Sequence, residues 1–139
     1  MTSQCSEKIG EPIVETIYTA EYIFRNNTTK EVTIRCYDRT DIYNEYYYDR
    51  PQEIISIAPD EEHTECYSYM GGGFAEPFFE YMLLYIEDGE YRVKHKFSEG
   101  LFIEDNYVLN TEREWYREYV FTFTDDFFKD GNPVDAPLR

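Results

Sequence analysis

The sequence predicts an all-β protein, an antiparallel two-sheet β-sandwich with at most one or two helical turns. Apolar and polar residues alternate with a period of two in several short runs that turn residues separate. Aromatic residues make up 19% of the 139 residues, and Tyr and Phe favour strands. No long amphipathic helical pattern is present, so we expect about seven strands in an immunoglobulin-like or related packing. Orthogonal or barrel packing is the structural alternative.

The first third of the chain predicts two strands and a loop. Residues 16–24 alternate, with Tyr18 and Tyr22 on the apolar face. Asparagine and threonine at 26–30 favour a turn, because short polar side chains bond the local backbone. The alternating run at 32–36 then completes a predicted hairpin. Residues 38–50 have no clean period and are predicted to form a loop over the sheet edge.

The middle of the chain predicts four further strands. Residues 52–58 and 63–70 alternate on either side of a turn that Pro59 initiates, and glycines end the second run. Residues 80–87 are apolar on both faces, as in a central strand that is covered on two sides. Asp88-Gly89 is a strong hairpin signal, and the strand that follows at 91–97 has a basic polar face.

The last third gives a mixed signal. Trp115, Tyr119 and Phe123 have helical spacing, but the β-forming residues at 120–124 favour a final strand, so we expect at most one helical turn before it. Thr124 is predicted to cap one more turn at 125–129. The predicted organisation is a leader or tether at 1–14, one sandwich domain at 15–131 and a loose tail at 132–139.

Charge excludes one large class of partners. The chain has 13 basic and 29 acidic residues and a net charge of −16, so its surface repels phosphate backbones. Nucleic acid is therefore not an expected partner. No apolar run approaches the roughly 20 residues that span a membrane.

Three cysteines leave two alternatives open. Cys36 and Cys66 fall on the apolar faces of two predicted strands. In an oxidising compartment they form a disulfide, and otherwise they stay buried as small apolar thiols. Cys5 stands apart from both, in a polar leader.

Several motifs resemble small uncharacterised lipoproteins of Bacteroidetes. Small residues precede Cys5, and the matching segments are residues 22–34, 57–61, 86–89 and 119–124. The resemblance implies lipid attachment at Cys5, a location in the cell envelope (periplasm or outer-membrane surface) and a β-sandwich of unknown function. No apolar segment precedes Cys5, so the resemblance also implies that a signal peptide has been removed.

Metal and cofactor sites receive little support. His63 and Glu65 share a strand face, but a closed zinc site needs four ligands and the chain has two histidines. Acidic residues from Asp125 to Asp135 offer oxygen ligands without the spacing of an EF-hand loop. We predict no metal, no cofactor and no catalytic residues.

Exposed aromatic residues are the best functional signal. Tyrosine provides a large, rigid contact area with a polar tip, which suits binding to sugars or proteins. The structural alternative is that these rings cap the core. The candidate binding residues are Tyr43, Tyr46, Tyr47, Tyr48, Tyr67 and Tyr69.

The sequence therefore predicts a non-catalytic envelope lipoprotein domain, a binding or structural accessory. Its partner is an unknown protein or glycan, and it meets the membrane only through the lipid. One alternative is an acidic inhibitor or immunity-type protein that binds a basic partner. The other is a small glycan-acting enzyme, which needs two carboxylates about 5 to 9 Å apart.

Overall fold

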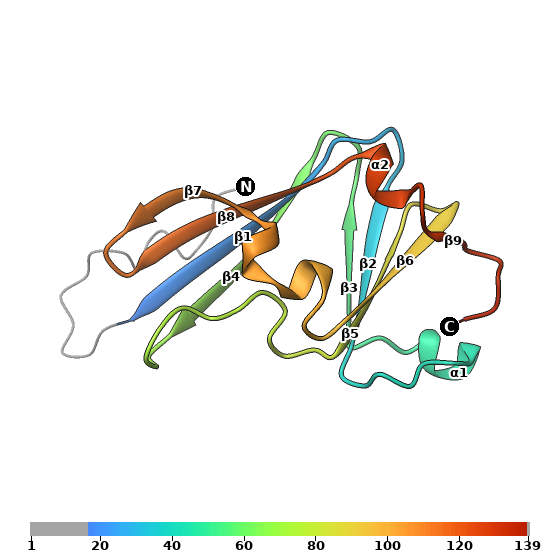
Figure 1. Cartoon of the computed structure of the whole chain (residues 1–139), viewed down its shortest axis with the longest axis horizontal. Coiled ribbons are helices and arrows are strands. Elements are labelled where there is room, and N and C mark those ends of the chain that lie inside the picture. Colours follow the sequence, from blue (N-terminus) through green and yellow to red (C-terminus); the bar gives the residue numbers. More distant parts are fainter. Residues whose placement is uncertain (1–16, 139) are drawn as a thin grey trace.

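The computed structural model describes residues 17–138 and confirms the all-β prediction. Two sheets pack as a sandwich, with their strands in the orders β4-β1-β8-β7 and β3-β2-β5-β6-β9 (Figure 1). The first sheet comprises β1 (Tyr18–Asn26), β4 (Glu62–Tyr69), β7 (Val108–Arg113) and β8 (Tyr116–Phe123). The second comprises β2 (Val32–Tyr37), β3 (Glu53–Ile57), β5 (Leu83–Glu87), β6 (Tyr91–Lys96) and β9 (Asn132–Pro133).

Helical structure is limited to short pieces in the connections. They are α1 (Glu45–Tyr48), α2 (Asp125–Phe128), and the 3₁₀ turns η2 (Gly100–Phe102) and η3 (Glu104–Asn106). The helix α2 begins after Thr124 as predicted, although the Thr124 side chain makes no capping hydrogen bond. The predicted loop at 38–50 contains α1.

The predicted hairpin between β1 and β2 is wrong, because the two strands belong to different sheets. Asn26 holds the connection between them. Its side-chain amide donates to the carbonyls of Lys30 (2.7 Å) and Ile57 (2.8 Å), and its Oδ1 accepts from the backbone N–H and the hydroxyl of Thr28. These bonds hold a corner that carries the chain from one sheet to the other. The turn-forming residues were recognised, but their geometry joins two layers instead of two paired strands.

The first sheet contains one parallel pair. Antiparallel pairing joins β1 to β4 and β7 to β8, whereas β1 and β8 run parallel, with Tyr22 opposite Tyr119. The second sheet is antiparallel throughout, and Gly89 supplies the positive φ of 90° at the β5–β6 hairpin. β7 and β9 are strands that the alternation did not predict.

The core lies between the inner faces of the two sheets. Tyr22 and Phe24 of β1 meet Ile34 of β2 and Ile86 of β5, and Phe123 of β8 closes the same cluster. The helical alternative at Trp115 is wrong, because Trp115 sits in the β7–β8 turn with φ of 70° and β8 begins at the next residue.

The segment after Gly131 is attached to the second sheet, not loose as we expected. β9 pairs with the start of β6, and the Val134 N–H donates to the Glu90 carbonyl (3.0 Å). Leu138 packs against a second apolar cluster. The folded unit therefore extends from β1 through residue 138.

Candidate functional site

A second, smaller core covers the outer face of the second sheet. Its buried members are Tyr37 of β2, Leu83 and Tyr85 of β5, and Ile42 from the loop before α1. The Tyr85 hydroxyl donates to the Ile42 carbonyl (3.2 Å), and the Tyr37 hydroxyl donates to the Tyr48 carbonyl. Burial raises the pKa of Tyr85 to about 12 and also raises the pKa of Tyr37, so both hydroxyls stay protonated donors.

Asn44 fixes the start of α1. It is the N-cap residue, and its side chain accepts a hydrogen bond from the Tyr47 N–H (3.3 Å). The backbone N–H of Asp49 closes the helix on the Glu45 carbonyl (2.9 Å). A single helical turn is held at both ends, so the tyrosines on it are displayed from a fixed backbone.

Four of the predicted tyrosines come together here, and we call Tyr43, Tyr46, Tyr47 and Tyr48 the tyrosine surface. Tyr47 and Tyr48 are half-buried and pack against the second core. Tyr43 and Tyr46 are 64% and 59% exposed. The capping interpretation therefore holds for Tyr47 and Tyr48, whereas Tyr43 and Tyr46 face solvent and binding by them stays a prediction.

An ion network lies under Tyr48. Arg92 Nε donates to the Glu87 carboxylate (2.9 Å), and Arg35 Nε lies 3.5 Å from the other oxygen of that carboxylate. The Tyr48 hydroxyl also donates to Glu87. Burial and the nearby Glu87 raise the pKa of Tyr48, so its hydroxyl stays protonated. The sequence signalled a basic face on β6 but not this network.

Each ring of the tyrosine surface has a cation against it. Arg50 lies 3.9 Å from the Tyr46 ring centroid and Arg39 lies 3.8 Å from that of Tyr47. The ammonium of Lys94 is 5.5 Å from the Tyr43 ring, and Arg35 is 4.6 Å from the Tyr48 ring. Such contacts stabilise a cation over an aromatic face.

A cavity of about 570 Å³ opens beside this surface. Tyr43, Tyr48 and Arg92 line one part of it, and the segment from Val134 to Leu138 lines another. Asn44, Glu45 and Asp49 add polar groups. Its size is within the range of small-molecule sites, and its lining combines aromatic faces with hydrogen-bonding groups.

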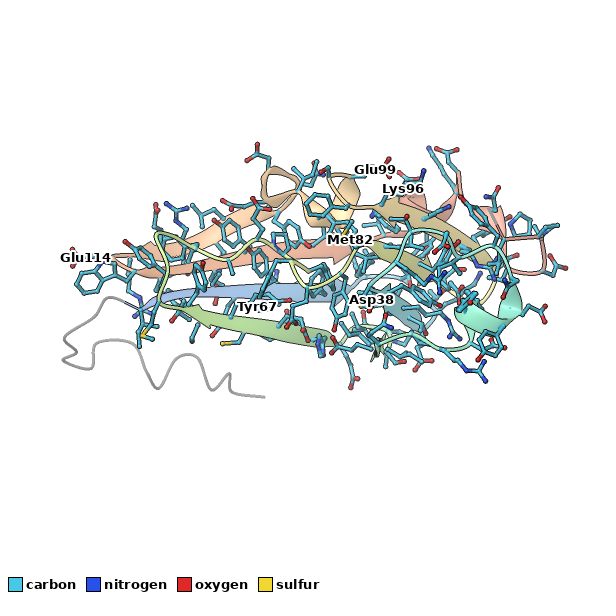
Figure 2. All side chains as sticks on the ribbon, turned by 90° about the horizontal axis from the view of Figure 1, so that it is seen from below. Asp38, Tyr67, Met82, Lys96, Glu99 and Glu114 are labelled. Atoms are coloured by element: carbon cyan, nitrogen blue, oxygen red, sulfur yellow. The ribbon has the colours of Figure 1, made fainter. Side chains whose placement is uncertain are left out.

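Tyr67 and Tyr69 do not join this surface. They lie on β4 in the first sheet, and Figure 2 shows Tyr67 on that strand, away from α1. The Tyr67 ring is partly buried between Tyr22 (5.8 Å between centroids) and Phe79 (5.3 Å). Tyr69 is 50% exposed. The six candidates thus form two separate groups.

The cysteines resolve one alternative. Cys36 is a free, buried thiol on β2, and burial raises its pKa above the usual range of a thiol. Cys66 lies on β4 of the other sheet and is disulfide-bonded, so that bond does not join it to Cys36. The Cys36–Cys66 bridge is therefore not formed. The predicted leader at 1–14, with Cys5, lies outside the described residues.

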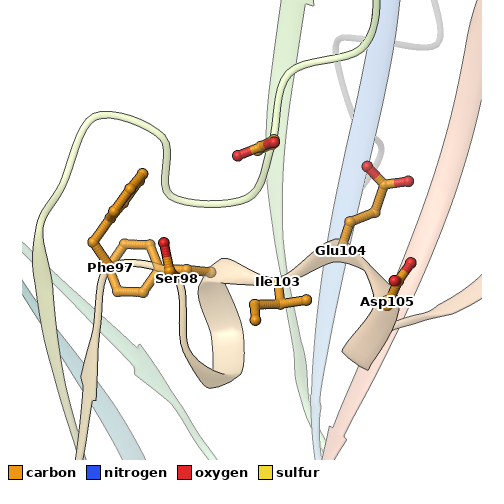
Figure 3. Close-up of a pocket in the computed structure, with 7 residues that line it drawn as sticks. Phe97, Ser98, Ile103, Glu104 and Asp105 are labelled. Carbon is orange, nitrogen blue, oxygen red and sulfur yellow. The ribbon is translucent and has the colours of Figure 1, made fainter.

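A second hollow, of about 380 Å³, lies beside η2 and η3. Three acidic residues line it, Glu76, Glu104 and Asp105, and Phe97 and Ile103 contribute apolar surface. Figure 3 shows Phe97 and Glu104 on opposite sides of the hollow. Glu104 accepts a hydrogen bond from the Tyr119 hydroxyl (2.6 Å). The sequence did not predict this hollow, because its acidic residues come from two connections that are distant in the chain.

Metal-ligating groups do not gather in the described part of the chain. Within residues 17–138 no group of three or more His, Cys, Asp or Glu side chains is placed to hold an ion. His63 contacts the Glu65 carboxylate on the shared face of β4. No helix in the same range is long and apolar enough to cross a membrane.

Comparisons with known proteins identify no relative. No family model matches the chain, and neither a curated protein nor a solved structure matches it. The geometry of the two hollows is therefore the basis for any functional assignment.

Proposed function

We propose that this chain is a non-catalytic binding domain of the bacterial cell envelope whose ligand surface is the tyrosine surface. The observation that carries the proposal is that two of its rings are packed on the second core and the other two are exposed. Tyr47 and Tyr48 are anchored in the second core, while Tyr43 and Tyr46 expose most of their area and Tyr43 also lines the cavity. Exposed aromatic rings on a rigid backbone bind at a low cost in conformational entropy.

The test is a double variant, Tyr43→Ala with Tyr46→Ala. We expect it to lose at least about tenfold in affinity for the solubilised envelope glycan and protein fractions of the native host, because two contact areas disappear. We expect its melting temperature to stay within about 2 °C, since surface substitutions cost little stability. Calorimetric titration and thermal melts measure both quantities.

Tyr69→Ala is the matched control, because Tyr69 has similar exposure on the other sheet. It should retain full binding. Equal binding by the double variant and the control would contradict the proposal. A large fall in the melting temperature of the double variant would assign Tyr43 and Tyr46 to capping the fold.

Attachment through Cys5 is the second part of the proposal and rests on the leader motif. The anchor and a Cys5–Cys66 disulfide exclude each other, because a lipidated Cys5 has no thiol left to form a disulfide with Cys66. Expression of the gene in its native host, followed by mass analysis of the Cys5 peptide without reduction, tests it. A diacylglycerol-modified Cys5 supports the anchor. A free Cys5, or Cys5 in a disulfide with Cys66, overturns it.

The acidic hollow favours a second candidate function, inhibition of a basic partner. Three carboxylates beside exposed Phe97 and Ile103 suit a basic side chain with an apolar stem, and the net charge of −16 would speed the encounter. The variant Glu104→Gln with Asp105→Asn should abolish co-purification of a basic protein from the native host. Tyr43→Ala should leave that co-purification unchanged.

A further inference from the structure

Most basic side chains within residues 17–138 are paired with carboxylates. Examples are Arg25 with Glu62, Arg39 with Asp41 and Lys129 with Asp126. In a chain with 29 acidic residues this pairing is expected. Among the described residues, the cations that make no ion pair are Arg50, Lys94, Lys96 and Arg113.

The unpaired cations are not spread evenly over the tyrosine surface. The half-buried rings of Tyr47 and Tyr48 hold Arg39 and Arg35, whose charges face Asp41 and Glu87. The exposed rings are different, because Tyr46 holds Arg50 and Tyr43 holds Lys94. Arg50 and Lys94, the two cations at the exposed rings, therefore have no carboxylate of the described residues within ion-pair distance.

Lys94 shows the electrostatic effect of this arrangement. Burial lowers its pKa, and the charge of Lys96 lowers it further, while Glu99 acts in the opposite direction. Lys94 and Lys96 are two residues apart on β6, so they project from the same face of the sheet. An anion placed at Tyr43 would relieve this repulsion.

A ligand in the cavity next to Tyr43 needs hydrogen-bond donors as well as negative charge. Glu45 and Asp49 line it and are acceptors only, so they match ligand hydroxyl groups and repel ligand carboxylates. Acidic sugars carry both kinds of group, and the C–H faces of their rings pack on tyrosine. An acidic peptide brings carboxylates but few hydroxyl donors.

We infer that the tyrosine surface binds an acidic oligosaccharide that contains uronic acid units. The carboxylates of the sugar contact Lys94 and Arg50, its hydroxyls donate to Glu45 and Asp49, and its ring faces pack on Tyr43 and Tyr46. This inference rests on the proposed function and specifies the ligand class for that surface.

Two trisaccharides with the same rings test the role of charge. Trigalacturonate carries the carboxylates, and its methyl-esterified form keeps the rings and hydroxyls without the charge. We expect calorimetric titration to show trigalacturonate binding at least about tenfold more tightly than the ester, because charge-assisted hydrogen bonds are among the strong ones. Equal affinity for the two overturns the inference.

Charge-removing variants locate the contact. Lys94→Gln and Arg50→Gln should each weaken trigalacturonate binding about tenfold and weaken binding of the ester by less than about threefold, because the ester has no charge for them to meet. Arg113→Gln is the matched control, because Arg113 is also unpaired and lies 4.5 Å from the Tyr116 ring in the other sheet. An equal loss in Arg113→Gln overturns the assignment to this surface.

Other probes separate failure of the inference from failure of the proposed function. Binding of hexaglutamate or inorganic phosphate with no binding of trigalacturonate overturns the sugar class. If no trisaccharide binds while the Tyr43→Ala, Tyr46→Ala variant still loses its envelope ligand, the inference fails and the binding function stands. If that variant loses nothing, both fail.

Discussion

At the scale of single residues, Asn26 connects the two sheets through its hydrogen bonds. Its side chain is buried and uses both amide donors and the carbonyl oxygen. Its backbone takes part as well, because the Asn26 carbonyl accepts from Asp60 and its N–H donates to the Glu61 carbonyl. The corner from β1 to β2 and the corner from β3 to β4 therefore meet at one side chain.

Replacing Asn26 by alanine should lower the free energy of unfolding by about 2 to 4 kcal/mol, because buried partners lose their hydrogen bonds. Urea unfolding followed by tyrosine and tryptophan fluorescence measures the change. Asn27→Ala is the matched control, since the Asn27 side chain is exposed, and it should cost less than about 0.5 kcal/mol. Similar losses in the two variants would contradict the role of the Asn26 side chain.

His95 makes stability depend on pH. Burial lowers its pKa below the ordinary value of 6.5, and its Nδ1 accepts a hydrogen bond from the Leu101 N–H (3.1 Å). His95 of the unfolded chain binds a proton near pH 6.5, whereas His95 of the folded chain binds it only at lower pH. The contribution of neutral His95 is therefore complete above about pH 6.5 and is lost as the pH falls toward its lower folded pKa.

We expect the free energy of unfolding to decline between pH 7 and pH 5, and the decline to be smaller in His95→Gln. Glutamine can accept the Leu101 N–H without titrating in this range. Urea unfolding across the pH series is the measurement. His63→Gln removes the other histidine and keeps the contribution of His95, so a pH profile of His95→Gln that matches wild type would disprove the account.

At the scale of elements, the segment that follows α2 closes the second core. Arg92 Nη2 donates to the Val134 carbonyl (2.8 Å), and β9 supplies two residues of pairing to β6. Alternation could not predict a strand of two residues, so the sequence predicted a loose tail at 132–139. This segment is held by hydrogen bonds from Arg92 to its backbone carbonyls. Such bonds do not depend on the side chains of the segment, so its own sequence does not predict them.

Ending the chain at Gly131 should lower the free energy of unfolding by about 2 to 4 kcal/mol, because Arg92 loses acceptors and the second core loses the packing of Leu138. Urea unfolding measures it, with a chain that ends at Leu138 as the control. A chain that ends at Gly131 with the stability of the control would show that the segment is loose, as its composition suggested.

Elements that depend on local pattern were predictable, and elements that depend on distant partners were not. The alternation at 91–97 and the Asp88-Gly89 turn correspond closely to β6 and its hairpin. β7 is mostly exposed at an edge, and a register shift between Leu109 and Thr111 interrupts it, so its sequence shows little alternation. The helical spacing of Trp115, Tyr119 and Phe123 has another origin, because Tyr119 and Phe123 lie four residues apart on β8 and therefore also share one face of a strand.

At the scale of the whole molecule, composition predicted the class but not the topology. The aromatic content matches a core in which rings of the first sheet and of its connections pack edge to face, such as Tyr22 with Tyr107 (5.2 Å between centroids). Whether β1 pairs with β2 or with β8 depends on Asn26 and on contacts more than 90 residues apart in the chain. The candidate site follows the same division, because tyrosines mark it in sequence and two of its cations, Arg35 and Lys94, come from strands of the second sheet.

The positions of β1 and α1 have a consequence for orientation. The described chain enters β1 at Tyr18, at one end of the long axis, and α1 lies at the other end (Figure 1). A support that holds the protein ahead of β1 would therefore lie at the end of the molecule opposite α1. The tyrosines would then point outward at the distal pole, within reach of a polymer that never touches the support.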